Sequence, residues 1–466
     1  GDSGYIESSF DENGDAVPAG IEDWCYRQLE NNFGMYYFHF RCHITWPISR
    51  VNEENSPKIE FIKTFGGSKN DSFQSIINST DGGYAILGFT QSNDDDITDK
   101  TDESFDYLLL KFSSDDTLQW SKTFGGSEDD RGAEVIATND GGFAILGYSK
   151  SSDGNLTENN GDQDFWIVKI SANGDISWQK SFGFSGADTG YAITETNDNG
   201  FLLTGVLDVS ASGGQGNKSV QKHAGGDVWA IKLDESGNKQ WQNYYGGTFT
   251  DTPFGVTKTN DNGFLICASS DSNDFNISNN KGQYDFWIFK IDANGTLVWE
   301  KNFGGSEIEE PRDICKTNDG NFMIVGDTRS NDKDVFKNNG AADLWVVKIN
   351  TDGNLLWEKT FGGSSFDAGR AIFPSLNGGF IIAGNSRSEN ANFSNLGQND
   401  GWILKIDDAG NQIWQQFYGG SENDFLNDII EMPDNSIIAI GESYSNNGLI
   451  PINKGFSDGL LIKLKN

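Results

Sequence analysis

The chain has 466 residues and a net charge of −35, from 69 acidic and 34 basic side chains. A chain this acidic repels phosphate backbones, so nucleic acid is not an expected partner, and no apolar run is long enough to predict a transmembrane segment. Four cysteines are too few for a disulfide scaffold, and 13% aromatic residues are too many for a disordered acidic tail.

The first 57 residues do not repeat, and we predict that residues 1–57 form an N-terminal extension. A short amphipathic helix is expected over residues 21–31, followed by a half-buried strand over residues 36–46, where aromatic and polar residues alternate. Cys25 and Cys42 both lie on apolar faces of these elements. In an oxidising compartment we therefore predict a disulfide between them.

From residue 58 to residue 466 one unit recurs seven times. Its first landmark is an aromatic residue followed by glycine, at intervals of 57 to 63 residues: Phe65, Phe124, Phe182, Tyr245, Phe303, Phe361 and Tyr418. Sixteen residues later comes a polar turn such as Asp140-Gly-Gly, and then an aspartate opens an apolar run such as residues 164–170. In six copies a tryptophan follows that aspartate by fourteen residues.

Each unit has room for four short strands, because the polar turns supply the positive φ that a tight hairpin needs. Several strands are apolar at nearly every position, as in residues 143–146, and must be covered on both faces. The fold class predicted is therefore all-β, a seven-bladed β-propeller of four-stranded blades. A β-solenoid is the main alternative, although its repeats are usually shorter and do not close.

The last copy ends before its fourth strand, whereas residues 59–65 precede the first copy and look like an isolated fourth strand. We predict that this N-terminal strand completes the last blade and closes the ring, which leaves no open sheet edge.

The motifs Trp-x-Lys-x-Phe-Gly-Gly-Ser, Asp-Gly-Gly-Phe-x-Ile-x-Gly and Asp-x-Trp-x-x-Lys-Ile resemble the propeller repeats of secreted proteins and surface lipoproteins of Bacteroidota-type bacteria. The resemblance covers all seven copies. It implies export to the medium or to the outer-membrane surface of a Gram-negative bacterium, with a membrane anchor upstream of this chain as one route. It implies no particular chemistry and no required cofactor.

All long connections are predicted on one face of the propeller, which makes that face the place for recognition. An acidic residue also recurs six positions after each aromatic landmark. Two interpretations stay open for it: a ring of carboxylates that holds a cation at the channel mouth, or caps for the backbone of each inner strand. The seven residues are Asp71, Asp130, Asp188, Asp251, Glu309, Asp367 and Asp424.

The long connections are rich in Asp and Asn, which offer the hard oxygen ligands that calcium prefers. One candidate calcium site comprises Asp153, Asn155, Asp162 and Asp164. No connection matches a known calcium-loop pattern, so Asx turns and plain solvation are the alternative.

Residues that depart from the repeat are the best candidates for function. Arg312 and Arg370 occupy one equivalent position in neighbouring blades, and Arg329 and Arg387 occupy another. These guanidinium groups suit carboxylate or sulfate ligands, and salt bridges to nearby acids are the alternative. The longest connection, residues 208–226, adds His223.

The function predicted is a non-catalytic surface or secreted binding protein, with a glycan or a surface protein as partner. A carbohydrate-active enzyme, either a polysaccharide lyase or a glycosidase, is the alternative, although no catalytic residues can be assigned. A structural subunit of an outer-envelope assembly is a third hypothesis.

Overall fold

The structure is a computed structural model that describes the backbone of residues 23–32 and 35–44 and all atoms of residues 56–208, 226–389 and 395–465. The chain divides into two units, Gly1–Ser56 and Pro57–Asn466. This boundary lies one residue before the one that the sequence predicted.

The described part of the first unit is a two-stranded antiparallel sheet of β1 (Asp23–Asn32) and β2 (Met35–Ile44). The helix predicted over residues 21–31 is wrong, because this segment forms β1. A helix this short is marginal in water, whereas pairing with β2 satisfies its backbone along ten residues. In this register Cys25 lies opposite Cys42, which is compatible with a cross-strand disulfide. The disulfide itself stays a prediction.

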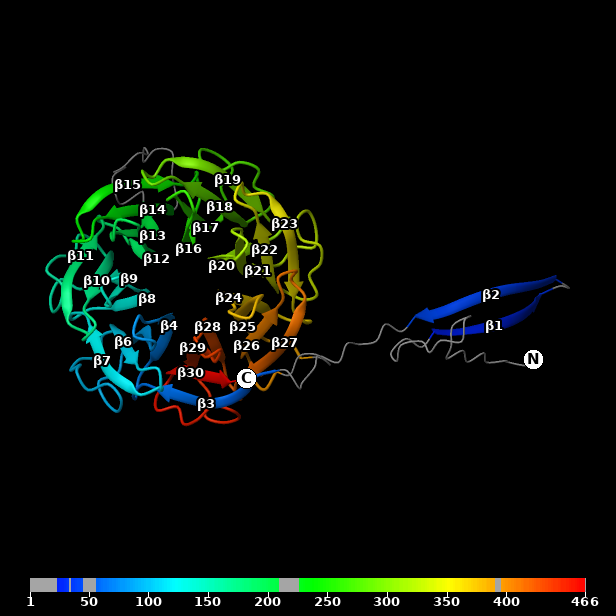
Figure 1. Ribbon diagram of the computed structural model, residues 1–466, viewed down its shortest axis with the longest axis horizontal. Coiled ribbons are helices and arrows are strands. Elements are labelled where there is room, and N and C mark those ends of the chain that lie inside the picture. Colours follow the sequence, from blue (N-terminus) through cyan, green and yellow to red (C-terminus); the bar gives the residue numbers. More distant parts are fainter. Residues whose placement is uncertain (1–22, 33–34, 45–55, 209–225, 390–394, 466) are drawn as a thin grey trace. The chain divides into compact units, whose positions relative to one another are not determined.

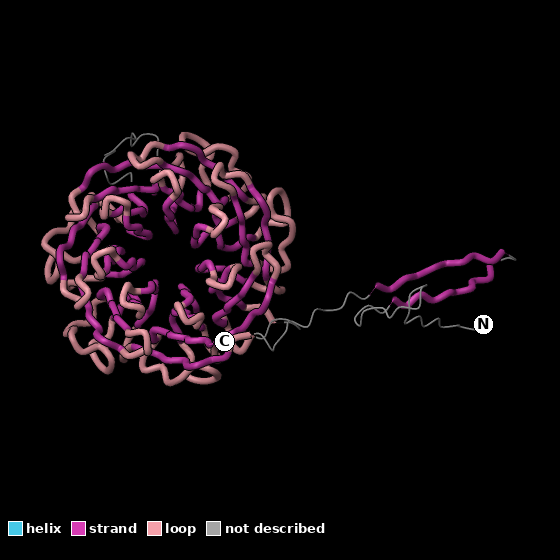
Figure 2. Tube along the Cα trace, in the orientation of Figure 1, coloured by secondary structure: helices cyan, strands magenta, loops and turns pink. Residues whose placement is uncertain are grey.

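The second unit is a propeller of seven four-stranded antiparallel sheets, as the sequence predicted (Figure 1). We number the blades 1 to 7 along the chain, starting from the blade whose innermost strand begins at Asp71. In blades 1 to 6 four consecutive strands run from the axis to the rim, whereas the outer strand of blade 7 is β3; Figure 2 shows these sheets arranged around the axis. The described residues contain no helix.

The strands of this unit are grouped here by their place in the blade. The innermost strands are β4 (Asp71–Asn78), β8 (Asp130–Ala137), β12 (Thr189–Glu195), β16 (Asp251–Lys258), β20 (Glu309–Lys316), β24 (Asp367–Pro374) and β28 (Asp424–Glu431). The second strands are β5 (Tyr84–Thr90), β9 (Phe143–Ser149), β13 (Phe201–Asp208), β17 (Phe264–Ser270), β21 (Phe322–Thr328), β25 (Phe380–Ser386) and β29 (Ile437–Ser443). The third strands are β6 (Asp106–Phe112), β10 (Asp164–Ile170), β14 (Gly226–Leu233), β18 (Asp285–Ile291), β22 (Asp343–Ile349), β26 (Asp400–Ile406) and β30 (Asp458–Lys465). The outer strands are β7 (Leu118–Phe124), β11 (Ile176–Phe182), β15 (Lys239–Tyr245), β19 (Leu297–Phe303), β23 (Leu355–Phe361), β27 (Gln412–Tyr418) and, for the seventh blade, β3 (Lys58–Phe65).

The hydrophobic core lies between neighbouring blades, because the second and third strands are apolar on both faces. Between blades 1 and 2, for example, Leu87 and Leu109 of one sheet form a cluster with Ile145 and Trp166 of the next. Stacking sheets around a ring is what covers both faces of every blade.

Two landmarks of the repeat are joined by an ion pair. The aspartate of the first turn forms an ion pair with the lysine of the third strand. Lys169 Nζ lies 2.8 Å from Asp140 Oδ2, and Lys348 Nζ lies 2.8 Å from Asp319 Oδ2. In blade 2 the turn itself is closed by Gly141, whose φ of 83° is unfavourable for other residues. The lysine–aspartate ion pair recurs in blades 1 to 5, whereas Lys405 of blade 6 donates to the Gly378 carbonyl and Lys463 of blade 7 pairs with Asp116.

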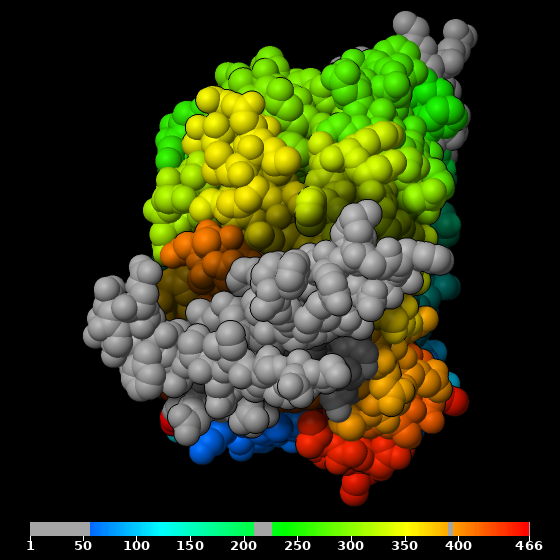
Figure 3. All heavy atoms as spheres, turned by 90° about the vertical axis from the view of Figure 1, so that its right-hand side faces the viewer, coloured from blue at the N-terminus to red at the C-terminus, as the bar shows by residue number. Residues whose placement is uncertain are grey.

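Ring closure is confirmed. Strand β3 pairs antiparallel with β30, from Lys58 opposite Lys465 to Phe65 opposite Gly459. The core between blades 7 and 1 joins Ile438 of one to Ile86 of the other, as the other interfaces do. Figure 3 shows the blue start of the propeller beside its red end.

Candidate functional site

The seven repeated acidic residues are completely buried. In blade 6 the Asp367 carboxylate accepts hydrogen bonds from the Gly363 N–H at 2.7 Å, the Ser386 hydroxyl at 2.5 Å and the Ser388 hydroxyl at 2.6 Å. The same bond from the backbone N–H four residues earlier recurs in all seven blades. This is the geometry of a structural cap and does not present the carboxylates at the channel mouth.

The aspartate that opens each third strand approaches the capping carboxylate of the next blade. At Gly125 an added Cβ would lie 2.6 Å from Asp106 Oδ1 and 2.6 Å from Asp130 Oδ2. The glycine after each aromatic landmark is therefore required because the two carboxyl groups leave no room for a side chain.

Replacement of one capping residue separates a structural cap from a cation ligand. Asp367→Ala is expected to lower the free energy of unfolding by about 2–4 kcal/mol, since it leaves buried donors unsatisfied. Asp367→Asn keeps an acceptor and is expected to cost about 1 kcal/mol or less. Thermal melts with calcium and with a chelator check the assignment, because a cation ligand would make the wild type sensitive to both and the Asn variant to neither.

The candidate calcium residues are not brought together as one ligand set. Asp153 Oδ1 accepts from the Ser127 N–H at 2.7 Å, and Asn155 Oδ1 accepts from the Gly125 N–H at 3.0 Å. Asp164 instead accepts from the Asn160 N–H at 2.8 Å, and Asp162 lies 3.7 Å from Lys150 Nζ. Across the described residues, no three His, Cys, Asp or Glu side chains form a group suited to a metal ion.

Every inner strand carries a β-bulge at the same place, nine residues after the aromatic landmark. The extra residue differs from blade to blade and is half-buried. These side chains meet around the axis, since Tyr191 lies 6.1 Å from Phe254 and the Arg312 guanidinium lies 4.7 Å from the Phe254 ring centroid. The bulge residues are Gln74, Ala133, Tyr191, Phe254, Arg312, Arg370 and Asn427.

All five arginines of the propeller lie at three repeat positions at the loop-rich end of the inner and second strands. Arg312 and Arg370 are bulge residues, Arg329 and Arg387 follow the second strands of blades 5 and 6, and Arg131 is the second residue of β8. The structure thus places the four predicted arginines in one sector, whereas His223 lies outside the described residues.

Acidic side chains lie among the four arginines of blades 5 and 6. Glu310 Oε2 lies 3.2 Å from Arg312 Nη2 and 4.0 Å from Arg329 Nη2. Burial raises the pKa of Asp327 to about 6, against the opposing effect of Arg312 and the other nearby arginines. Salt bridges to nearby acids, the alternative to ligand binding, are therefore present for Arg312 and Arg329, both through Glu310.

Arg370 differs from its neighbours. Within the described part of the chain it has no ion pair or hydrogen bond, whereas the buried and unpartnered Nε is a feature that it shares with Arg131 and Arg312. Burial, together with the nearby Arg312, lowers the pKa of Arg370 to about 10. Asp327, Glu310 and Glu442 oppose this lowering, so Arg370 lies among charges of both signs.

Sequence analysis missed Arg131 and Glu442. The Arg131 guanidinium lies 3.9 Å from the Phe105 ring centroid, and Arg131 Nη2 lies 3.9 Å from Asp129 Oδ2. Burial raises the pKa of Glu442, and Arg370 and Arg131 oppose that rise. The signal in the sequence that could have identified Arg131 is its departure from the repeat, because no other copy has an arginine directly after the capping acid.

Large apolar side chains are exposed on the connections of the same face. Phe336 is 88% exposed and Ile452 is 77% exposed. The described connections of blades 1 and 2 have no exposed large apolar side chain, so these exposed apolar residues are confined to blades 4 to 7 among the described connections. We call it the apolar rim and define it as Phe249, Phe275, Phe336, Leu396, Leu449, Ile452 and Phe456.

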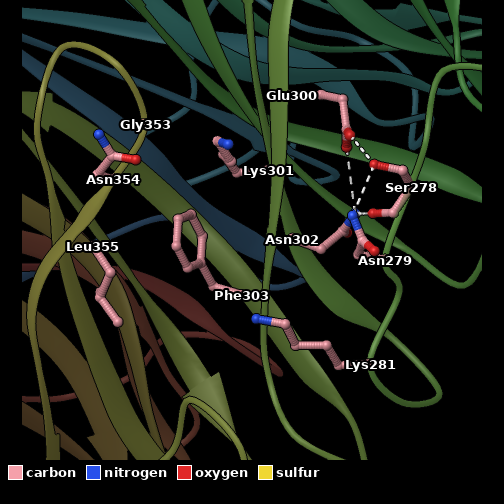
Figure 4. A pocket seen from close by; sticks show the side chains of 10 residues that line it. All are labelled: Ser278, Asn279, Lys281, Glu300, Lys301, Asn302, Phe303, Gly353, Asn354 and Leu355. Carbon is pink, nitrogen blue, oxygen red and sulfur yellow. Dashed lines mark hydrogen bonds between the residues drawn. The ribbon is translucent and has the colours of Figure 1, made fainter.

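A separate pocket of about 390 Å³ lies between the outer strand β19 and the turn before β23 (Figure 4). Its walls include Glu300, which accepts a hydrogen bond from the Ser278 hydroxyl at 2.5 Å, and Lys301. Neither the arginines nor the apolar rim line it.

No protein-family model matches the chain. The regulatory protein FlaEY of Caulobacter vibrioides is 21% identical over 251 residues, which are 50% of this chain and only 25% of that protein. A Bacteroides caccae protein of unknown function is 12% identical with a TM-score of 0.39, over 71% of this chain and 93% of that one. The Pan2 WD40 domain of Neurospora crassa is 9% identical with a TM-score of 0.46, over 88% and 96%. These likenesses assign no function.

Proposed function

We propose that this chain is a non-catalytic binding protein, secreted or held at the cell surface, whose loop-rich propeller face binds a glycan or protein partner. One observation carries the proposal: the blades share caps and cores, whereas the side chains that depart from the repeat on this face are concentrated in neighbouring blades, with four arginines in blades 5 and 6 and the exposed apolar side chains in blades 4 to 7. Variable residues on a rigid repeated scaffold are the usual basis of recognition.

The size and composition of the apolar rim support a binding role. Seven large apolar side chains, including the 69% exposed Phe456, lie on consecutive blades of a very acidic chain. Exposed apolar clusters with polar surroundings are typical of interaction surfaces. Aromatic and arginine side chains are also the residues that contribute most to binding energy.

The cellular location is part of this proposal and is supported by the resemblance of the repeats to those of exported proteins. No helix in the described part is long and apolar enough to cross a bilayer. We propose the extracellular space or the outer-membrane surface of a Gram-negative bacterium, with an anchor upstream of this chain as the route of attachment.

A surface-matched pair of variants tests the function. Phe336→Ser with Ile452→Ser removes two rim side chains, and Leu356→Ser with Leu376→Ser removes two exposed side chains elsewhere on the propeller. Against arrayed neutral and acidic polysaccharides and immobilised envelope proteins, the rim variant is expected to bind the wild-type partner at least about tenfold more weakly. The control variant should stay within about twofold.

Equal retention by the wild type and the rim variant would reject this face as the binding surface. Release of shortened or unsaturated oligosaccharides by the wild type would instead establish the lyase or glycosidase alternative. Melting temperatures of both variants within about 2 °C of the wild type are the control for folding.

A further inference from the structure

We propose that the pocket between the outer strand of blade 4 and the turn before β23 of blade 5 binds a neutral sugar unit of a glycan. We call it the wall pocket and define it by Ser278, Glu300, Lys301, Asn302 and Leu355, which are among its lining residues (Figure 4). The inference goes beyond the proposed function, because neither the arginines nor the apolar rim line this pocket.

The first observation is a buried acceptor without a donor. Asn302 lines the pocket and is 7% exposed, and its Nδ2 donates to the Ser278 carbonyl at 2.6 Å. That bond fixes the orientation of the amide group, because a carbonyl oxygen accepts from the nitrogen and not from the oxygen of an amide. Asn302 Oδ1 is then left without a hydrogen-bond donor among the described residues. An unpaired buried acceptor destabilises a fold, so its retention indicates a donor that a ligand supplies.

The second observation is a lysine without a carboxylate. The stem of Lys301 packs on the turn of blade 5, where an added Cβ at Gly353 would lie 3.0 Å from Lys301 Cγ. At the equivalent place between blades 1 and 2, Lys122 Nζ lies 2.9 Å from Asp175 Oδ1. Asn354 takes the position of that aspartate in blade 5, and Lys301 has no ion pair or hydrogen bond within the described ranges. Its ammonium group is therefore available to an oxygen of a ligand.

The combination does not recur at the next junction. Between blades 5 and 6, Lys359 packs on the following turn as Lys301 does, but Thr360 takes the place of Asn302. Phe336 takes the place of Ser278 there. The groove beside Lys359 thus lacks the buried amide, which makes this lysine a matched reference for Lys301.

The charges around the wall pocket favour a neutral ligand. Lys301 repels a cation, and the carboxylate of Glu300, which accepts from the Ser278 hydroxyl at 2.5 Å, repels an anion. A sugar hydroxyl is a donor and an acceptor at once, so it can donate to Asn302 Oδ1 and accept from Lys301 Nζ. On the opposite side of the pocket Leu355, which is 38% exposed, offers an apolar contact for the C–H face of the ring (Figure 4).

The shape of the site favours a sugar over a polypeptide. Its volume of about 390 Å³ lies in the range of sites for small ligands, and its unused polar groups belong to side chains around one cavity. An extended polypeptide would instead pair with the open edge of an outer strand through its backbone. That mode does not depend on the side chains of Lys301 and Asn302, so substitutions separate the two ligands.

The test measures the retention of neutral hexasaccharides of glucose, xylose, mannose and galactose on immobilised full-length protein. We expect the wild type to retain at least one of them, and Asn302→Thr and Lys301→Met each to reduce that retention at least about fivefold. Lys359→Met is the matched control and should stay within about twofold. The melting temperature of Asn302→Thr should not fall below that of the wild type, because threonine occupies this position in blades 1, 5 and 7.

Retention of none of these sugars would overturn the inference, as would equal retention by the wild type and both pocket variants. An equal loss in Lys359→Met would show a general effect of surface charge and would also overturn it. Stronger retention of polygalacturonate or spermine than of every neutral sugar would reject a neutral ligand, and retention of uncharged octapeptides alone would reject the glycan. If the Phe336→Ser, Ile452→Ser variant loses a sugar that Asn302→Thr still binds, the proposed function stands and the wall pocket fails. The reverse result supports the wall pocket and rejects the loop-rich face for that sugar.

Discussion

A chain that starts at Gly66 is expected to lose the closed ring, with a loss of stability of at least about 5 kcal/mol. Without β3, the backbone of β30 becomes an open edge along its length. Phe61 and Phe65 also leave the core between blades 7 and 1, and Ile62 leaves the core between blades 6 and 7. Thermal unfolding should shift down by several degrees or more, and the protein should self-associate.

Two further chains make this prediction specific. A chain that starts at Pro57 retains β3 and should unfold at the same temperature as the full-length propeller. A permuted chain with residues 57–65 moved behind β30, through a turn like residues 113–117, should recover the stability, because the other outer strands follow their third strands in this way. Equal melting of the chains that start at 57 and at 66 would contradict the closure argument.

The propeller is also expected to be more stable at pH 5 than at pH 8. Burial raises the pKa of Asp343, Asp400 and Asp458 to about 6 and that of Asp106 and Asp285 to about 7, above their ordinary 3.8. The folded state therefore favours the protonated carboxyl groups, and their stabilising contribution is lost as the pH rises from about 4 through 7. The expected fall in melting temperature between pH 5 and pH 8 is about 5 °C.

At low pH the dependence of stability on pH is reversed, because a second group of carboxylates has lowered pKa values. Ion pairs with lysine and hydrogen bonds hold the pKa of Asp81, Asp140 and Asp261 at about 2, despite partial burial. Their contribution is present above about pH 4 and is lost as the pH falls towards 2. Stability should therefore peak near pH 4 to 5 and decrease on both sides.

Paired variants identify the groups responsible. Asp343→Asn with Asp400→Asn imitates the neutral carboxyl groups, so it should raise the melting temperature at pH 8 and change it little at pH 5. Asp352→Asn, at an exposed turn position, is the control and should leave the pH profile unchanged. A wild-type melting temperature that does not vary between pH 5 and pH 8 would contradict the account.

The sequence pattern predicted the strands of the propeller correctly but predicted the wrong element in the N-terminal extension. The strands around Asp140-Gly-Gly and residues 164–170 lie where hairpin turns and apolar runs predicted them. The helix predicted over residues 21–31 failed, because the partner strand β2 competes for the same backbone and local periodicity does not register that competition.

By itself the sequence determined the number of blades, their strand order and the closure by β3, because each blade repeats the same landmarks and only one strand was missing and one was left over. Only the tertiary structure decided that the repeated carboxylates are buried caps, that Arg131 and Arg370 both act on Glu442, and that Arg312 and Arg329 share Glu310. The physical reason is that repeats encode contacts within a blade and with the next blade, which recur at fixed spacing. Contacts around the axis join residues that differ in every blade, and their pairing depends on the geometry of the whole ring.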